Sequence, residues 1–223
     1  QKTKEQAFAL LSQANMTENY SINEVEVFCQ AITKSLPCDL AFENTSEQQA
    51  WQEALSANHS PAELMQLYSR IVLSKVDEKA LNEVTKFSTE AVVLVSLSPI
   101  AIVDMLIMLS RNLRMINKVA GLYGLKLGYW SRIKLIKQVF VNKAYAGASE
   151  IISDLGADVL GAELLGKLST RFAQGLGAGM LTARLGIKSI QLCRPIPFED
   201  KPELSSIRKK LVLQMKALLN GNT

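Results

Sequence analysis

Apolar side chains recur at helical spacing along much of the chain. One apolar stripe follows Ser60-Pro61-Ala62-Glu63, in which serine is a helix cap, proline takes the first helical position and glutamate the third. The stripe recurs at i, i+3, i+4, i+7 and i+8: Leu64, Leu67, Tyr68, Ile71 and Val72. No stretch shows sustained alternation of apolar and polar residues, and no Asn-Gly turn separates two apolar runs. The pattern predicts an all-α, multi-helix bundle with short connections and no significant sheet.

Two further capping signals lie in the first third of the chain. Ser21 and Glu24 have the spacing of a capping box, in which each residue's side chain bonds the other's backbone N–H. The apolar stripe that follows them consists of Ile22, Val25, Phe28 and Ile32. Thr45 and Gln48 repeat the spacing before a helix that is expected to run through Trp51.

The signals divide the chain into four sections. Residues 1–20 are expected to be the end of an amino-terminal helix with a short polar connection, and residues 21–58 a small acidic helical subdomain. Residues 60–198 are expected to form the main helical body. An Arg-Pro-Ile-Pro-Phe sequence then interrupts the helical pattern, because proline removes a donor and restricts the residue before it. Residues 199–223 have the pattern of a basic amphipathic helix.

Residues 91–109 form the most apolar segment, with nineteen residues and one charge. A continuous helix of that length would measure about 28 Å, close to the hydrocarbon core of a bilayer. However, Ser98-Pro99 repeats the cap-and-proline signal, and Asp104 would cost about 2.5–3.5 kcal/mol near the centre of a membrane helix. Two interpretations stay open: two buried helices that meet at Pro99, which we favour, or a hairpin that dips into a membrane. In a soluble core Asp104 would be a buried acid satisfied by a basic partner or by hydroxyl groups.

The net charge of +4 conceals a strong asymmetry. Residues 1–104 hold 7 basic and 14 acidic residues, whereas residues 105–149 hold eight basic residues and no acidic one. A block of one sign favours surfaces of the opposite sign, such as lipid head groups or acidic proteins. The candidate contact residues are these eight cations: Arg111, Arg114, Lys118, Lys126, Arg132, Lys134, Lys137 and Lys143.

Aromatic residues lie within the basic block. Tyr123, Tyr129 and Trp130 are interleaved with the cations, which suits a membrane interface with anionic lipid, where rings sit at head-group level. No helix-turn-helix or RNA-stacking signature accompanies them, so nucleic acid is not an expected partner. The structural alternative is that half of the charges cap helix ends or pair with the acidic first third.

Small residues recur at a spacing of four. Gly175, Gly179 and Ala183 place small side chains on one helix face, and Gly124 and Gly128 share that spacing. Such faces let a second helix backbone approach closely. We expect them to serve helix packing, either inside the domain or between copies in a homo-oligomer.

Motifs that resemble nucleotide sites fail in their details. Residues 161–168 nearly match a phosphate-binding loop, but Leu168 replaces the required Ser or Thr, and Glu163 would put a negative charge in an anion cradle. The glycines of residues 174–179 lack the spacing of a dinucleotide fingerprint. His59 is the only histidine, and no cluster of potential metal ligands surrounds it in the sequence. We expect no catalytic residue, no metal ion and no cofactor, and therefore no enzyme.

Cysteine usage favours a reducing compartment. The chain has three cysteines, an odd number without the Cys-x-x-Cys spacing of a zinc or redox site. The first residues, Gln1 to Asn15, are charged and helical in pattern, unlike a signal peptide. Because the sequence begins without methionine, we expect it to be part of a longer protein.

Four segments in the last two thirds of the chain carry a family resemblance. They are LSPIAIVDM (97–105), RNLRMINKVAGLYGLKLGYWSR (111–132), AGASE (146–150) and STRFAQGLGAGMLTARLGIKSIQLCRPIPF (169–198). Together they resemble the bacterial YcjF family of inner-membrane proteins, whose function is uncharacterised. Members of that family carry two membrane segments near the amino terminus. The resemblance implies that this chain is the large cytoplasmic part after such an anchor, with residues 1–15 continuing from the last membrane helix.

The resemblance also implies a partner. The gene for YcjF typically neighbours that of YcjX, a GTPase-type protein of the envelope-stress response, and related domains occur fused to GTPases. It therefore implies a GTPase partner rather than GTPase activity, and it carries no catalytic residue. Two functions follow: a membrane-associated adaptor that binds anionic lipid or such a partner, and a homo-oligomerising scaffold. An enzyme or nucleotide binder is a remote third.

Overall fold

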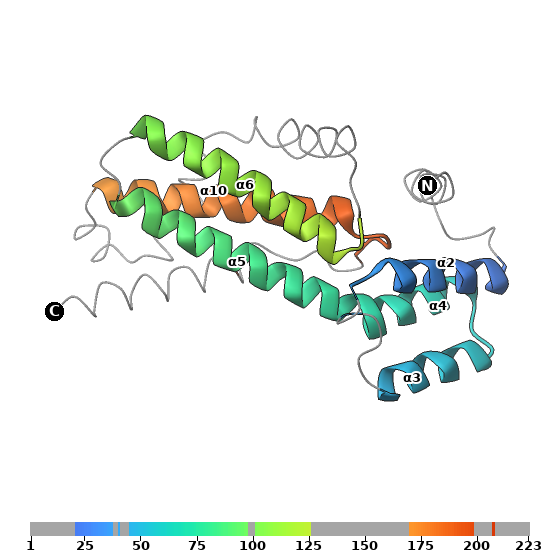
Figure 1. Ribbon diagram of the computed structural model, residues 1–223. Coiled ribbons are helices and arrows are strands. Elements are labelled where there is room, and N and C mark those ends of the chain that lie inside the picture. Colours follow the sequence, from blue (N-terminus) through green and yellow to red (C-terminus); the bar gives the residue numbers. More distant parts are fainter. Residues whose placement is uncertain are drawn as a thin grey trace, which may run out of the picture. The chain divides into compact units, whose positions relative to one another are not determined.

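The computed structural model describes residues 21–37, 40, 45–97, 101–125, 170–198 and 207. Every regular element within these residues is a helix, and none is a strand, which confirms the predicted all-α class (Figure 1). The helices are α2 (Ile22–Ser35), α3 (Thr45–Ser56), α4 (Pro61–Tyr68), the π-helix η1 (Ser69–Leu73), α5 (Ser74–Leu97), α6 (Ala101–Leu122) and α10 (Thr170–Cys193).

Two helices begin at the capping boxes predicted from the sequence. The Glu24 backbone N–H donates to Ser21 Oγ at 3.3 Å, and the Ser21 N–H donates to the Glu24 carboxylate at 2.9 Å. Ser60 and Glu63 make the same exchange at 3.3 and 2.8 Å, with Pro61 in the first turn. These bonds favour the charged carboxylates and lower the pKa of both Glu24 and Glu63. Both predicted helix starts are confirmed.

The chain divides into two compact units. Unit 1 comprises Gln1–Ala80, Ala120–Lys126 and Cys193–Glu199, and unit 2 comprises Leu81–Val119, Leu127–Leu192 and Asp200–Thr223. Within unit 1, α4 packs against α2 and α3. The domain boundaries expected from the sequence stay a prediction.

The core of unit 1 centres on Tyr68 of α4. Its side chain is fully buried, and the Trp51 ring of α3 meets its ring edge to face, with centroids 5.1 Å apart. Its hydroxyl shares a hydrogen bond of 2.9 Å with Thr33 Oγ1 of α2. One aromatic side chain therefore links three helices, and its burial raises the pKa of the Tyr68 phenol.

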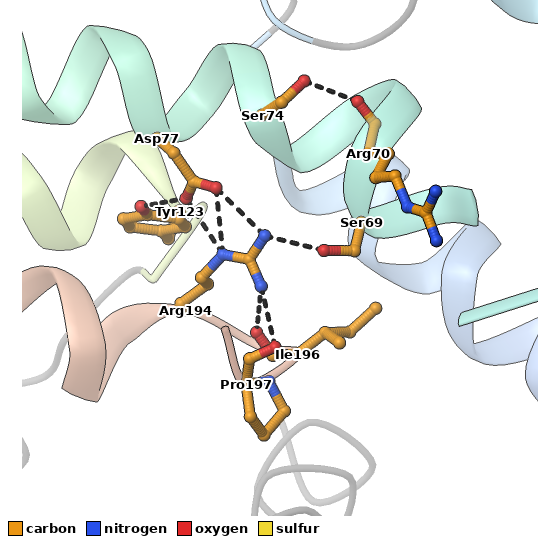
Figure 2. Close-up of polar contacts among 8 residues, drawn as sticks. All are labelled: Ser69, Arg70, Ser74, Asp77, Tyr123, Arg194, Ile196 and Pro197. Atoms are coloured by element: carbon orange, nitrogen blue, oxygen red, sulfur yellow. Dashed lines mark hydrogen bonds and ion pairs between the residues drawn. The ribbon is translucent and has the colours of Figure 1, made fainter. Parts of the chain in front are cut away.

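The π-helix η1 joins α4 to α5. Its wider turn is visible where the Ser74 N–H donates to the Ser69 carbonyl, five residues back. The Ser74 hydroxyl also donates to the Arg70 carbonyl at 2.6 Å. A π-helical turn adds one residue to a helix without ending it, and such turns often lie at functional sites. Here the turn presents Ser69 to the buried cluster described below (Figure 2).

In unit 2, α5 and α6 pack antiparallel and α10 lies alongside them (Figure 1). Arg111 of α6 pairs with Glu90 of α5, and Lys118 pairs with Glu83 at 2.8 Å. The two pairs are separated by seven residues on each helix. Ile207 is also buried.

Glycines of α10 allow α5 to come close. A Cβ at Gly175 would lie 2.6 Å from the Val92 carbonyl oxygen, and a Cβ at Gly179 would lie 2.9 Å from that of Ser88. Real Cβ atoms do not approach so closely, so neither position accepts a side chain without a shift of backbone. Ala183, one step further along the same spacing, is fully buried. The small-residue face of α10 is therefore covered by α5 of the same chain.

Gly124 departs from the sequence-based expectation. It does not lie on a helix face but in the turn after α6, with φ at +70°. Only glycine adopts this conformation readily, and a Cβ there would also press on the Ser35 carbonyl. The close approach is therefore one of a turn to the end of α2. Gly128, its expected partner, lies outside the described residues.

The apolar segment at residues 91–109 is divided between two helices. α5 ends at Leu97 and α6 begins at Ala101, which confirms separate helices on the two sides of Pro99. Of the helices described, none combines the length and hydropathy needed to cross a bilayer. The side chain of Asp104 lies outside the described residues, so its predicted burial stays a prediction.

Candidate interaction face of α6

The exposed stripe of α6 changes character along the helix. Its exposed positions recur every three or four residues: Ile107, Ser110, Arg114, Lys118 and Gly121. Leu106 and Leu109 widen the stripe at its start, and both are exposed. Among the described side chains the stripe is therefore mainly apolar from Leu106 to Leu109 and basic at Arg114 and Lys118. Lipid interfaces favour such a gradient, because they offer hydrocarbon next to charged head groups.

Two of the three described cations of the basic block have partners inside unit 2. Arg111 pairs with Glu90 and lies over the Phe87 ring, with its guanidinium carbon 5.7 Å from the ring centroid. Lys118 pairs with Glu83 and stays half exposed. Arg114 is exposed, and the described residues offer it no ion-pair partner. Glu83 and Glu90 therefore neutralise two cations of the block, although neither acid belongs to the first third of the chain.

The ion pairs of unit 2 leave polar atoms unpaired. Arg111 Nε and Glu83 Oε2 are buried and have no hydrogen-bond partner among the described residues. Ion pairs near the surface contribute about 0–1 kcal/mol each. The other predicted contact residues lie outside the described residues: Lys126, Arg132, Lys134, Lys137 and Lys143.

Hydroxyl and amide groups are buried inside unit 2. Ser88 and Ser189 are fully buried, and each donates to the backbone carbonyl four residues earlier at 2.7 Å. Thr182 of α10 donates to Asn112 Oδ1 of α6 at 3.1 Å, and both side chains are buried. Thr85 is also buried and donates to Leu81 at 2.8 Å. Hydroxyls that donate to the carbonyl four residues earlier are satisfied within their own helix, so their burial leaves no hydroxyl unpaired.

Unit 1 buries charged residues instead. Arg194 directs Nε to both carboxylate oxygens of Asp77 at 3.0 Å, and Nη2 to Ser69 Oγ at 2.8 Å (Figure 2). Its Nη1 donates to the carbonyls of Ile196 and Pro197, the latter at 3.1 Å. Nη2 also lies 3.0 Å from Asp77 Oδ2, so two guanidinium nitrogens face the carboxylate, and this bidentate contact in a buried setting is a strong charge-assisted interaction.

Tyr123 completes the cluster from the turn after α6. Its hydroxyl donates to Asp77 Oδ1 at 2.6 Å, and burial next to the Asp77 charge raises the pKa of the phenol. The prediction that Tyr123 belongs to a membrane-interface aromatic set is therefore wrong, because the ring is buried in unit 1. Tyr129 and Trp130 lie outside the described residues.

The cluster holds three distant segments together. Tyr123 and Arg194 both donate hydrogen bonds to Asp77. The guanidinium carbon of Arg194 also lies 4.1 Å from the centroid of the Phe198 ring. The sequence shows a signal for Asp77, an acid beside Leu73, Val76 and Ala80 on an apolar helix face. No local signal identifies its partner 117 residues away. The arrangement stabilises the chain after α10 and leaves no free acid or base for catalysis among these groups.

Two cysteine thiols lie in the interior of unit 1. Cys29 and Cys193 are both free and buried, and burial raises the pKa of each thiol to about 12. Such thiols are poor nucleophiles and poor metal ligands at neutral pH, because they stay protonated. Cys38 lies outside the described residues.

No metal-binding group of three His, Cys, Asp or Glu side chains occurs in the described part of the chain. His59 has Glu63 beside it, with Nδ1 3.9 Å from the carboxylate, as part of the α4 cap. The phosphate-loop resemblance at residues 161–168 lies outside the described residues.

A family model described as "Domain of unknown function (DUF697)" matches residues 59–217. The chain belongs to this family. The matched DUF697 region begins at His59, directly before the Ser60 cap, and includes α4 to α10 and with them Asp77, Tyr123 and Arg194. Both α2 and α3 precede it.

Similar proteins are named as membrane proteins. A UPF0283 membrane protein of Pectobacterium atrosepticum is 40% identical over 206 residues, which cover 92% of this DUF697 chain and 58% of the relative. UPF0283 membrane proteins of Yersinia pestis and Yersinia pseudotuberculosis are 40% identical over 203 residues, covering 90% of this chain and 57% of theirs. The chain thus spans 57–58% of the length of these relatives. No solved structure matches it.

Proposed function

We propose that the protein is a non-catalytic, membrane-associated helical adaptor that presents unit 2 to an anionic membrane surface. The observation that carries the proposal is the exposed face of α6 in unit 2. The described interior of unit 2 is mainly apolar and also holds some hydroxyl and amide groups, whereas leucines and an arginine of α6 face outward. The names of the relatives support a membrane setting, since 92% of this chain aligns with the first of them.

The finer parts of the proposal follow from the family resemblance. The protein would lie on the cytoplasmic side of a bacterial inner membrane and bind a GTPase-type partner of the envelope-stress response. The exposed cations support contact with an acidic surface, whether of lipid or of protein. The lipid contact is tested first because it needs no knowledge of the protein partner.

Flotation with lipid vesicles tests the proposal. The protein is mixed with vesicles of phosphatidylcholine alone or of equal parts phosphatidylcholine and phosphatidylglycerol, at low and high salt. We expect flotation only with the anionic vesicles and weaker flotation at high salt. Failure to float with anionic vesicles at low salt would refute the lipid contact.

A charge-reversal pair locates the contact. Arg114→Glu should weaken binding to anionic vesicles by roughly tenfold, since a cation near such a surface contributes about 1 kcal/mol and reversal turns attraction into repulsion. Lys34→Glu changes the net charge by the same amount on an exposed position of α2 in unit 1. Equal losses in the two variants would show that only net charge matters and would remove α6 from the proposal.

The second candidate is a homo-oligomerising scaffold. Its proposed surface was the small-residue face at Gly175, Gly179 and Ala183. This face is covered by α5 within unit 2, so it is not free to bind a second copy. A scaffold would need another surface, and light scattering across micromolar concentrations decides whether the protein associates.

A further inference from the structure

The end of unit 2 beyond the Glu90–Arg111 pair carries four of the seven large apolar residues that are exposed in the described chain. Leu97 is 75% exposed and Leu106 is 65% exposed, and Ile107 and Leu109 are exposed beside them. Elsewhere in the described residues only Ile22, Val27 and Leu181 are large, apolar and exposed. An apolar patch of this kind at the end of a helical pair marks an interaction surface.

We propose that this apolar end, residues 91–97 of α5 and 106–110 of α6, enters the interface of a phospholipid bilayer as a shallow wedge. The wedge stops at the Glu90–Arg111 pair. This inference rests on the membrane role proposed above and adds how the contact is made: by burial of leucine side chains in addition to charge.

The positions of the charges set the depth. Residues 91–97 and 106–110 contain no charged residue, whereas Glu90 and Arg111 follow at once on the two helices. The seven residues of α5 after Glu90 measure about 10 Å and the ten residues of α6 before Arg111 about 15 Å, and both lengths are far below the roughly 30 Å of a hydrocarbon core. Asp104, the one charged residue of the sequence between Glu90 and Arg111, also favours a shallow position.

The packing between the helices at this end is compatible with either water or lipid outside the bundle. Gly175 lies against Val92 and Ser96, and Gly179 lies against Ser88 and Val92. Close backbone contact of this kind does not depend on water outside the bundle, because it relies on van der Waals packing of small residues. The three helices can therefore keep their arrangement when their outer leucines move from water into lipid.

Charge favours lipid over a second copy of the chain. Arg114 is exposed next to the apolar end and has no ion-pair partner among the described residues, whereas Lys118, one turn later, is paired with Glu83. Two copies that joined through their apolar ends would bring their Arg114 side chains together, whereas anionic head groups would neutralise them. A bilayer offers hydrocarbon for the exposed leucines and anionic head groups for the arginine.

Nitroxide labels on single cysteines measure the depth. Labels are placed by Leu106→Cys, Leu109→Cys and Arg114→Cys, with Val27→Cys on α2 as the control, in a Cys38→Ser background. The buried Cys29 and Cys193 thiols, whose pKa is raised to about 12, compete little for the reagent. Collision rates with oxygen, which concentrates in lipid, and with a water-soluble nickel complex are compared with and without the anionic vesicles.

The expected result is a gradient. Labels at positions 106 and 109 should gain oxygen contact and lose nickel contact on vesicle binding, the label at 114 should report the head-group level, and the label at 27 should stay in water. Flotation together with water-exposed labels at 106 and 109 would overturn the wedge and leave the electrostatic contact standing. Absence of flotation would refute both. Spin–spin broadening without vesicles would show that a second copy covers the end.

A pair of serine variants gives an independent measure. Leu106→Ser with Leu109→Ser should weaken vesicle binding by roughly tenfold in low and high salt alike, since the lost contribution is apolar. Val27→Ser removes an equally exposed apolar side chain from unit 1 and should leave binding unchanged. Unchanged affinity in the double variant, with helix content preserved by circular dichroism, would overturn the wedge.

Discussion

Unit 1 buries two opposite charges, Asp77 and Arg194, whereas the described part of unit 2 buries hydroxyl and amide groups and leaves leucines in solvent. In unit 1 the charged groups are saturated: the guanidinium contacts a carboxylate, a hydroxyl and two carbonyls. In unit 2 the ion pairs lie near the surface, and Arg111 Nε and Glu83 Oε2 stay unpaired.

The contrast teaches how each unit depends on its surroundings. A buried ion pair needs all its partners, because a charge left alone in the interior is strongly unfavourable. A buried hydroxyl that donates to a carbonyl of its own helix, as those of Ser88 and Ser189 do, needs no hydrogen-bond partner from another segment. Unit 1 is therefore expected to be sensitive to single polar substitutions. Unit 2 is expected to be sensitive to side-chain size at its helix contacts.

The largest expected effect is in the cluster of unit 1. Asp77→Ala leaves the Arg194 guanidinium buried without its carboxylate, and we expect it to lower the free energy of unfolding by about 3–5 kcal/mol. Urea denaturation, followed by Trp51 fluorescence in a Trp130→Phe background, measures the loss in unit 1. Tyr123→Phe removes only one hydrogen bond and should lower it by about 1–3 kcal/mol. Equal losses in the two variants would show that the ion pair contributes no more to stability than the single hydrogen bond of Tyr123.

The second effect is steric and belongs to unit 2. Gly175→Ala puts a Cβ against the Val92 carbonyl, which should cost about 1–3 kcal/mol. Gly177→Ala is the matched control on the same helix, because no atom lies within 4 Å of its Cβ. It should stabilise the protein by up to about 1 kcal/mol through helix propensity. If Gly175→Ala proved as stable as Gly177→Ala, α5 and α10 would not be in close contact.

Alkaline pH should weaken unit 1, where both described thiols lie. Burial raises the pKa of Cys29 and Cys193 from 9.0 to about 12, so the folded chain keeps both protons to higher pH than the unfolded chain. This contribution is complete below pH 9 and is lost as pH rises from about 9 toward 12. We expect the free energy of unfolding to fall by about 1.4 kcal/mol per pH unit for each thiol. Denaturation under reducing conditions at pH 8, 9 and 10 checks this, and Cys29→Ala should halve the slope.

The smallest expected effect compares exposed apolar residues of the two units. Leu106→Ser in unit 2 and Val27→Ser in unit 1 should each change stability in water by no more than about 0.5 kcal/mol, because both side chains are already in solvent. Thermal denaturation without lipid measures this. A loss of several kcal/mol for Leu106→Ser alone would mean that its side chain is covered in solution, and the contrast between the units would weaken.

Local features were predictable from the sequence and long-range ones were not. The helix starts at Ser21 and Ser60 depend on residues three positions apart, so their signals are contained in short segments. The separation of α5 from α6 around Pro99 follows in the same way from the restrictions that proline imposes.

The site residues depended on tertiary contacts. Arg111 and Lys118 looked like free cations because nothing local shows that Glu90 and Glu83 face them across two helices. Gly124 had the spacing of a helix-packing residue, but α6 ends just before it, and the spacing alone does not reveal where a helix stops. The partnership of Asp77 with Arg194 joins residues 117 positions apart, which no short pattern encodes.

The wider turn of η1 accommodates one extra residue without changing the rotational phase of α5. Each residue of an α-helix turns the chain by about 100°, but Ser74 bonds the Ser69 carbonyl five residues back and so takes the place that the residue before it would hold in a regular helix. Deletion of one residue from Ser69–Leu73 would therefore restore regular winding and leave Asp77 facing Arg194. A deletion between Ser74 and Asp77 would instead rotate Asp77 away by that angle, so length variation within the family should be tolerated in η1 and not just after it.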